Sequence, residues 1–190
     1  MVAALLLALP VGIIVFGLHW PTVAVEAAVI AAILYVEKTA APRIGRWARG
    51  ARGEELVGAV LAELEEDGWF ALHDVRFDKG NIDHVVVGPA GIYTIETKSH
   101  RGRISSHEID YRMLRQAYAE AKVIERITGL RAEPLLVFSN AYLTPAITRR
   151  HGVLILPARM LRKHLRQRPG AIPRARVLEV YRRLATSLPA

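Results

Sequence analysis

Apolar residues fill the first part of the chain almost without interruption. Residues 2–18 form a run of 17 apolar residues, which is at the short end of the length that crosses the hydrocarbon core of a bilayer. The residues HWPT interrupt this run, and a second apolar run over residues 23–36 contains a single carboxylate, Glu26. We expect a transmembrane hairpin over residues 1–37, with a single span followed by an interfacial helix as the alternative.

Basic residues follow the apolar segment at once. Residues 38–52 carry five Lys or Arg residues, no acid, and several Gly and Pro residues, which is typical of a basic juxtamembrane linker. An excess of positive charge beside a membrane span holds that side in the cytoplasm. We therefore expect a bacterial-type cell membrane location, with the rest of the chain in the cytoplasm.

Beyond residue 53 the spacing of apolar positions changes between the periods of helices and strands. The predicted strands cover residues 69–77, the two arms of a hairpin within 80–99, 102–104, 134–140 and 152–157. The predicted helices cover residues 54–67, 105–128, 158–168 and 174–187, with a loop or short helix at 143–147. Ser105 and Glu108 form a capping-box pattern that would open the long helix, and Gly129 would end it.

The order of these elements predicts the fold class. A helix, three or more strands, a helix, two strands and two helices do not form a regular βαβ array, so we expect an α/β fold with a mixed sheet flanked by helices. Residues 53–157 would form this domain, and residues 158–190 would add two basic C-terminal helices.

The charges are distributed unevenly along this domain. The net charge is +8, yet residues 149–183 carry eleven Lys or Arg residues against one acid, Glu179, whereas residues 54–83 carry nine acids against two bases. An acidic segment and a basic segment in one small domain suggest a metal site beside a surface that binds a polyanion. A basic, solvated face near a membrane is the alternative. The chain has no cysteine, which excludes disulfides and Cys-ligated metal.

The hairpin places charged residues together at one end. If the residues GPAG form its loop, Val87 lies opposite Ile92, and counting back brings Asp83 opposite Glu96. Opposed residues share a face, and Lys98 lies on that face too. Two opposed carboxylates repel each other, and Mg²⁺, which prefers hard oxygen ligands, would relieve the repulsion. The alternative is an exposed strand end with an ion pair between Lys98 and one carboxylate.

The stretches GEELVGAVLAEL and GNIDHVVVGPAGIYTIETKS resemble the nuclease-related domain (NERD) family, a branch of the PD-(D/E)xK nuclease superfamily. The resemblance runs from about residue 53 to residue 140. It implies a restriction-endonuclease-like fold and a metal-dependent catalytic core formed by Asp83, Glu96 and Lys98, with Asp83 and Glu96 holding Mg²⁺ or Mn²⁺. In place of the superfamily's motif proline, Ile82 precedes the aspartate, which is usual for this branch.

The resemblance implies two further catalytic residues, Glu54 and Gln116. Glu54 matches the acid of the family's first helix, and Glu55 takes its place if the register slips by one. The alternative is that Glu54 is only a first-turn carboxylate, which the helix dipole favours. Gln116 matches a glutamine on the helix after the third strand. The family's Asn-Pro before that glutamine is replaced by Met113 and Leu114.

These features together predict a membrane-tethered, cytosolic, Mg²⁺-dependent nuclease that hydrolyses phosphodiester bonds of DNA or RNA. A catalytically silent module of the same fold, binding nucleic acid or acting as a scaffold at the membrane, is the alternative. His84 should point away from Asp83 and be structural. We expect the following basic side chains to contact phosphates of the nucleic acid: Arg162, Lys163, Arg166 and Arg168.

Overall fold

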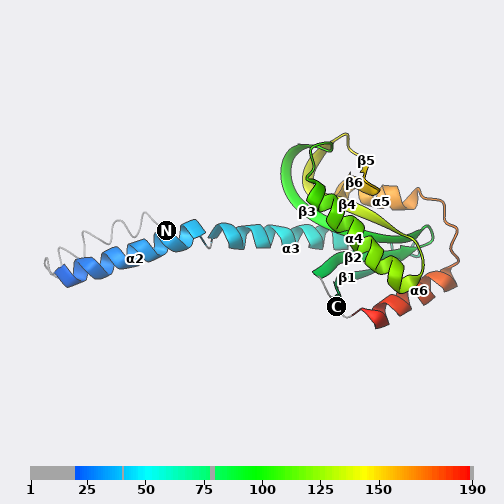
Figure 1. Cartoon of the computed structure of the whole chain (residues 1–190), viewed down its shortest axis with the longest axis horizontal. Helices are drawn as coiled ribbons and strands as arrows, with labels where there is room; N and C mark the ends of the chain where they lie inside the picture. The colour runs from blue at the N-terminus through cyan, green and yellow to red at the C-terminus, as the bar shows by residue number, and fades with distance from the viewer. Residues whose placement is uncertain (1–19, 40, 78–79, 189–190) are drawn as a thin grey trace. The chain divides into compact units, whose positions relative to one another are not determined.

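The computed structural model describes residues 20–39, 41–77 and 80–188 (Figure 1). The chain divides into two compact units, residues 1–48 and residues 49–190, which are treated separately below. The first predicted membrane span, residues 2–18, lies outside the described residues.

The first unit is helical where it is described. Helix α2, Trp20–Thr39, contains the predicted second span, and helix α3, Ala41–Ala62, begins in this unit. Within the described part of the chain, no helix combines the length and the apolarity needed to cross a membrane. The helix that was predicted to begin at residue 54 begins earlier, because α3 also includes residues 41–52 of the predicted basic linker. Pro42 lies in the first turn of α3, where a missing N–H costs no helical hydrogen bond.

The second unit is built on one mixed six-stranded sheet, which confirms the predicted class. Its strands are β1 (Phe70–Phe77), β2 (Gly80–Gly88), β3 (Gly91–Ser105), β4 (Ala132–Thr144), β5 (Thr148–Arg150) and β6 (Val153–Pro157). They lie in the order β1-β2-β3-β4-β6-β5. The β3–β4 and β4–β6 pairs are parallel, and the other three pairs are antiparallel.

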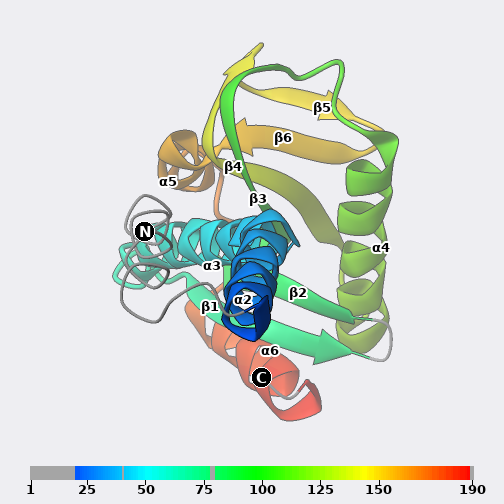
Figure 2. The ribbon, with the colours of Figure 1, turned by 90° about the vertical axis from the view of Figure 1, so that its left-hand side faces the viewer.

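Three further helices cover the sheet (Figures 1 and 2). They are α4 (Tyr111–Thr128), α5 (Ala158–Arg166) and α6 (Arg174–Ser187). Apolar side chains of α3 and α5 pack on one face, where Val57 and Leu161 meet Ile95 and Val137 of the sheet. Helices α4 and α6 cover the other face. The strands between these layers therefore carry long buried apolar runs, as expected for a sheet covered on both faces.

Two boundaries differ from the prediction. Helix α4 does not begin at the Ser105–Glu108 pattern, because the carboxylate of Asp110 caps the helix by accepting a hydrogen bond from Arg112 N at 2.8 Å. The segment assigned to the start of that helix, and the separate short strand before it, belong instead to strand β3 and the turn that follows. Strand β3 runs on to Ser105 beside β4, with an irregularity in register between Lys98 and Arg101.

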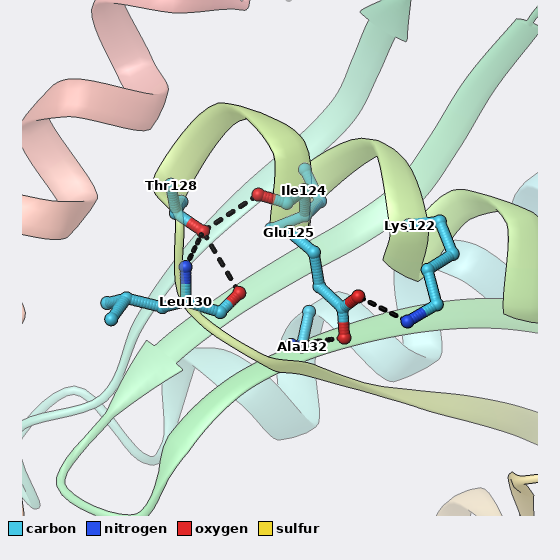
Figure 3. Close-up of polar contacts among 6 residues, drawn as sticks. All are labelled: Lys122, Ile124, Glu125, Thr128, Leu130 and Ala132. Atoms are coloured by element: carbon cyan, nitrogen blue, oxygen red, sulfur yellow. Dashed lines mark hydrogen bonds and ion pairs between the residues drawn. The ribbon is translucent and has the colours of Figure 1, made fainter.

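The end of α4 is fastened to the beginning of β4 (Figure 3). Gly129 closes the helix in the left-handed conformation, as predicted. The hydroxyl of Thr128 donates to Ile124 O at 2.8 Å and accepts from Leu130 N at 3.1 Å. The carboxylate of Glu125 accepts from Ala132 N at 3.3 Å and forms an ion pair with Lys122. These contacts fix α4 against the sheet, and so fix the side chains that the helix directs at β3.

Candidate active site

The hairpin register is the predicted one. His84 pairs with Ile95, Val85 with Thr94, and Val87 with Ile92. Asp83 and Glu96 are the next residues beyond the His84–Ile95 pair, on the side away from the turn. The carboxylate of Asp83 accepts a hydrogen bond from the backbone N–H of Thr97 at 2.7 Å, which ties it to β3 directly beside Glu96.

Glu96 is almost fully buried, with 4% of its surface exposed. Its Oε1 forms an ion pair with Nζ of Lys98. Its Oε2 is buried and has no hydrogen-bond partner among the described residues. A buried carboxylate oxygen without a donor is costly for the fold, so this atom indicates a site that is shaped for something other than stability.

The environment of Asp83 disfavours its charge. Burial raises the pKa of the Asp83 carboxyl to about 7, and the neighbouring carboxylates of Glu96 and Glu54 act in the same direction. The hydrogen bond from Thr97 and the ammonium of Lys98 act in the opposite direction but do not prevail. Carboxylates that raise one another's pKa are a common mark of functional sites.

Glu120 is a member of this site that the sequence analysis missed. It projects from α4, is 2% exposed, and accepts a hydrogen bond on Oε1 from Nε2 of Gln116 at 3.0 Å. Burial and then the charge of Glu96 raise the pKa of the Glu120 carboxyl to about 9. Its Oε2 is buried and, like that of Glu96, meets no N–H or hydroxyl donor among the described residues. A side-chain hydrogen bond between the carboxyl groups of Glu120 and Glu96 contributes to the raised pKa, so the proton of Glu120 is shared with Glu96. At neutral pH Glu120 therefore keeps a proton close to two carboxylates.

The sequence contained one signal for Glu120. Glu120 follows Gln116 by four residues, so the two lie on one side of a helix. It also interrupts the apolar stripe of α4, between Ala117 and Ala121, both of which are buried. An acid within a buried stripe needs a partner, and this argument would have added Glu120 to the predicted site.

Glu54 reaches the site from α3. It is half-buried, and its pKa is raised first by burial and then by the charge of Glu96. Glu55, the rival by register, is exposed. Gly53 permits this approach, because a Cβ there would lie 2.8 Å from Ser139 Oγ and 3.2 Å from Ser99 Cβ. The Gly-Glu pair thus places a helix close to the sheet and a carboxylate beside Glu96.

His84 has the structural character that was predicted. It is buried, and its Nδ1 lies 2.7 Å from Nδ1 of His73. Burial and then His73 lower the pKa of His84 to about 4, so the ring of His84 is neutral at neutral pH.

The basic residues predicted to contact phosphates are mostly paired with acids. Arg162 pairs with Glu63, Arg166 Nε lies 2.6 Å from Asp67 Oδ2, and Arg168 donates to both oxygens of Glu133 at 2.7 and 2.8 Å. Lys163 is exposed and has no ion pair with any residue in the described ranges. Their contact with nucleic acid stays a prediction.

The donor set fits a hard divalent cation. No three of the His, Asp and Glu side chains within residues 20–39, 41–77 and 80–188 are grouped so that they could hold a metal ion by themselves. Asp83 and Glu96 nevertheless offer carboxylates that are close enough for each other's charge to matter. Mg²⁺ commonly takes one or two protein carboxylates and leaves its other positions to water and substrate.

The chain belongs to the nuclease-related domain (NERD) family, whose model matches residues 49–148. These residues include every side chain of the site described above. An uncharacterised protein of Bacillus anthracis is 30% identical over 88 residues, which are 44% of this chain. The chain spans 41% of the length of that relative.

Two solved structures show distant likenesses. A repair endonuclease from Pyrococcus abyssi is 15% identical, with a TM-score of 0.32 over 54% of this chain and 38% of that protein. SfsA of Pyrococcus furiosus, solved in complex with Ca²⁺, is 19% identical, with a TM-score of 0.30 over 72% of this chain and 53% of that protein. Scores this low carry no argument about the activity.

Proposed function

We propose that the chain is a metal-dependent nuclease that hydrolyses phosphodiester bonds of DNA or RNA. One observation carries the proposal: in a member of a nuclease-related family, buried carboxyl groups that raise one another's pKa gather beside a lysine at the end of a hairpin. The cluster is costly for a protein that only needs to fold.

Each side chain of the cluster has a role in this proposal. Asp83 and Glu96 would hold Mg²⁺ or Mn²⁺, which would supply a Lewis acid and a bound water of lowered pKa. Lys98 would leave Glu96 and stabilise the charge that develops on the scissile phosphate. Glu120 would hold a proton beside Glu96, oriented by the amide of Gln116. Glu54 would add a further negative charge close to Glu96.

Nucleic acid would reach the site over basic surfaces. Strand β3 continues beyond Lys98 with Arg101 and Arg103, and Arg103 is in register with Tyr142 of β4. Tyr142 is 63% exposed, and the guanidinium of Arg159 lies 5.0 Å from the centre of its ring. An exposed aromatic ring among arginines suits base stacking and phosphate contact.

The four predicted phosphate-binding residues of the C-terminal part would serve the same purpose. A phosphate backbone would compete with carboxylate partners for Arg162 and Arg166, because both pairs lie at the surface and exchange easily. Such contacts would be independent of sequence and sensitive to salt.

A membrane tether remains part of the proposal. The apolar run 2–18 and the basic residues that follow support an anchor with residues 53–190 in the cytoplasm. A reporter fused after Ala190 should be active only in its cytosolic form. Activity of a reporter that works only outside the cytoplasm would contradict this arrangement.

A catalytically silent binding or scaffold module is the second candidate. It is favoured by the ion pair between Lys98 and Glu96, which occupies the two residues that catalysis would need apart. In that case the cluster would be a remnant of the family's fold, and only binding of nucleic acid would be measurable.

Cleavage by the whole chain distinguishes the two candidates. Supercoiled DNA and a labelled RNA should be cut in the presence of Mg²⁺ or Mn²⁺ and left intact with a chelator. Glu96→Gln should abolish cleavage, whereas Glu66→Gln, at an exposed acid, should leave it unchanged. Absence of cleavage of both nucleic acids by the wild-type chain would favour the silent module.

A further inference from the structure

A second cluster of charged residues lies away from the carboxylates. It lines a cavity of about 500 Å³ where β3 and β4 begin. The polar and charged side chains of its lining are Tyr93, Arg131, Glu133, Arg149 and Arg168. Tyr93 precedes Glu96 by three residues, roughly 10 Å along the strand, and points to the opposite face of the sheet. This cavity is therefore distinct from the candidate active site.

The cavity has an excess of positive charge. Three guanidinium groups surround one carboxylate, that of Glu133, which gives the lining a formal charge of +2. Arg168 and Arg149 both pair with Glu133, so one acid is shared between two bases. Nε of Arg168 is buried and has no hydrogen-bond partner among the described residues. Arg131 is exposed and forms no ion pair with any residue of the described ranges.

The walls of the cavity are held in place by the fold. Tyr93 is in register with Glu133 across the β3–β4 pair, and its ring packs against Trp69 at 5.7 Å between centres. Burial, and next the charge of Glu133, raise the pKa of the Tyr93 phenol, whereas Arg168 acts in the opposite direction through its charge and a side-chain hydrogen bond. The hydroxyl therefore keeps its proton beside Arg168. Arg131 and Glu133 lie at the start of β4, directly after the end of α4 that is hydrogen-bonded to Leu130 and Ala132 (Figure 3).

We propose that this cavity binds the terminal phosphate of a nucleotide-sized ligand. A phosphomonoester carries nearly two negative charges at neutral pH, which matches the excess of +2. Guanidinium groups bind phosphate through paired hydrogen bonds. The cavity presents three of them, and that of Arg131 is exposed and has no ion pair within the described ranges. The volume lies within the range of small-molecule sites, and Ile92 and Ala90 supply an apolar wall for the rest of the ligand.

Calorimetric titration of the whole chain, in a chelator, with inorganic phosphate and with a nucleoside 5′-monophosphate tests this proposal. We expect both to bind, and the nucleotide more tightly. Arg131→Gln should weaken both affinities about tenfold, the size expected for one charge-assisted hydrogen bond. Arg126→Gln, at an exposed arginine of α4, is the matched control and should change neither.

Glu133→Gln provides a test with the opposite sign. It removes the carboxylate that competes for Arg149 and Arg168, so phosphate should bind more tightly, although the loss of two ion pairs lowers stability. A merely structural role of these arginines predicts no gain. Absence of phosphate and nucleotide binding by the wild-type chain, or unchanged affinity in Arg131→Gln, would overturn the proposal.

Two oligonucleotides identify the source of the phosphate. If the ligand is the end of a nucleic acid, an oligonucleotide with a 5′-phosphate should bind more tightly than the same strand without it, and Arg131→Gln should remove the difference. If the ligand is a free nucleotide, the two strands should bind equally while the nucleotide still binds. Asp83→Asn, which changes the carboxylate cluster, should bind phosphate like the wild type. Phosphate binding at the cavity can therefore be tested even if the proposed nuclease activity is not found.

Discussion

Charged residues are arranged in opposite ways at the carboxylate cluster and along helix α5. At the cluster, Glu96 and Glu120 are buried close to each other, and Glu120 keeps its proton at neutral pH beside Glu96. Along α5, Arg162 and Arg166 are exposed and each is paired with an acid near the end of α3. Acidic groups are therefore brought together in the interior, at the cost of one charge, and opposite charges are paired at the surface.

The two arrangements have different effects on the stability of the fold. Surface pairs contribute little stability, about 0 to 1 kcal/mol each, and they need no purpose beyond solubility. Buried carboxylates that lack partners cost free energy, so they persist where another demand opposes their removal. The acidic and basic segments of the sequence predicted a charged site in both regions, but only the carboxylate cluster has the properties of a catalytic site.

The largest expected effect is on catalysis at Lys98. Lys98→Ala should lower kcat by about 10²- to 10³-fold, the loss typical of one group that stabilises charge in a transition state. It should retain Mg²⁺ binding, because it removes a cation from Glu96 rather than a ligand. Lys122→Ala is the matched control, since Lys122 also pairs with a glutamate but lies outside the cluster. An equal loss in the two variants would remove Lys98 from the mechanism.

Two glycines of α3 test how the helix is brought to the sheet. A Cβ at Gly50 meets nothing within 4 Å, whereas at Gly53 it would lie 2.8 Å from Ser139 Oγ. Gly50→Ala should stabilise the chain by up to about 1 kcal/mol through helix propensity, and Gly53→Ala should destabilise it by about 1 to 2 kcal/mol through overpacking. Urea unfolding of both variants measures the difference. Equal gains would show that Gly53 is not needed for a close approach.

Much of this arrangement could be predicted from the sequence. The hairpin register follows from the strict alternation around GPAG, and the bounds of α6 match the predicted helix, because both patterns are local. The start of α4 was mispredicted because two capping signals lie within six residues and Asp110 provides the cap in the structure. The start of α3 was placed too late because its first part contains Gly and Pro, which occur there at positions that tolerate them.

Spacing along the chain predicted the candidate site only within the hairpin, whereas Glu54 and Gln116 were expected from the family resemblance. Asp83, Glu96 and Lys98 lie on one hairpin, so their proximity follows from strand pairing. Glu120 comes from α4, and its contact with the cluster depends on how that helix packs on β3, which no local pattern specifies. Pairing of Arg162 and Arg166 with acids almost a hundred residues earlier was inaccessible for the same reason.

The titration of Glu120 gives a stability effect that depends on pH. Its pKa is raised from 4.5 to about 9 in the folded chain, so between these values the unfolded chain releases a proton that the folded chain keeps. Stability is therefore fully present below 4.5 and is lost as the pH rises towards 9. In a chelator, Glu120→Gln should remove this loss, so the stability of the variant relative to the wild type should increase as the pH rises. A slope against pH identical to that of the wild type would contradict the assigned pKa.

The smallest effect is expected at the surface pairs. Arg166→Ala should cost at most about 1 kcal/mol, because its partner Asp67 stays solvated after the change. Lys163→Ala, on the same helix and without an ion pair in the described ranges, is the control and should cost less. Urea unfolding at low and high salt measures both. A loss of several kcal/mol in the free energy of unfolding of Arg166→Ala would contradict the view that the Arg166–Asp67 pair is a weak surface interaction.

Calorimetric titration with Mg²⁺ tests the central claim most directly. We expect the wild-type chain to bind Mg²⁺ and Glu66→Gln to bind it equally. Asp83→Asn and Glu96→Gln should each lose binding while remaining folded. Wild-type protein that takes up no Mg²⁺, or a Glu96→Gln variant that binds it as the wild type does, would contradict the claim that the buried carboxylates are a metal site.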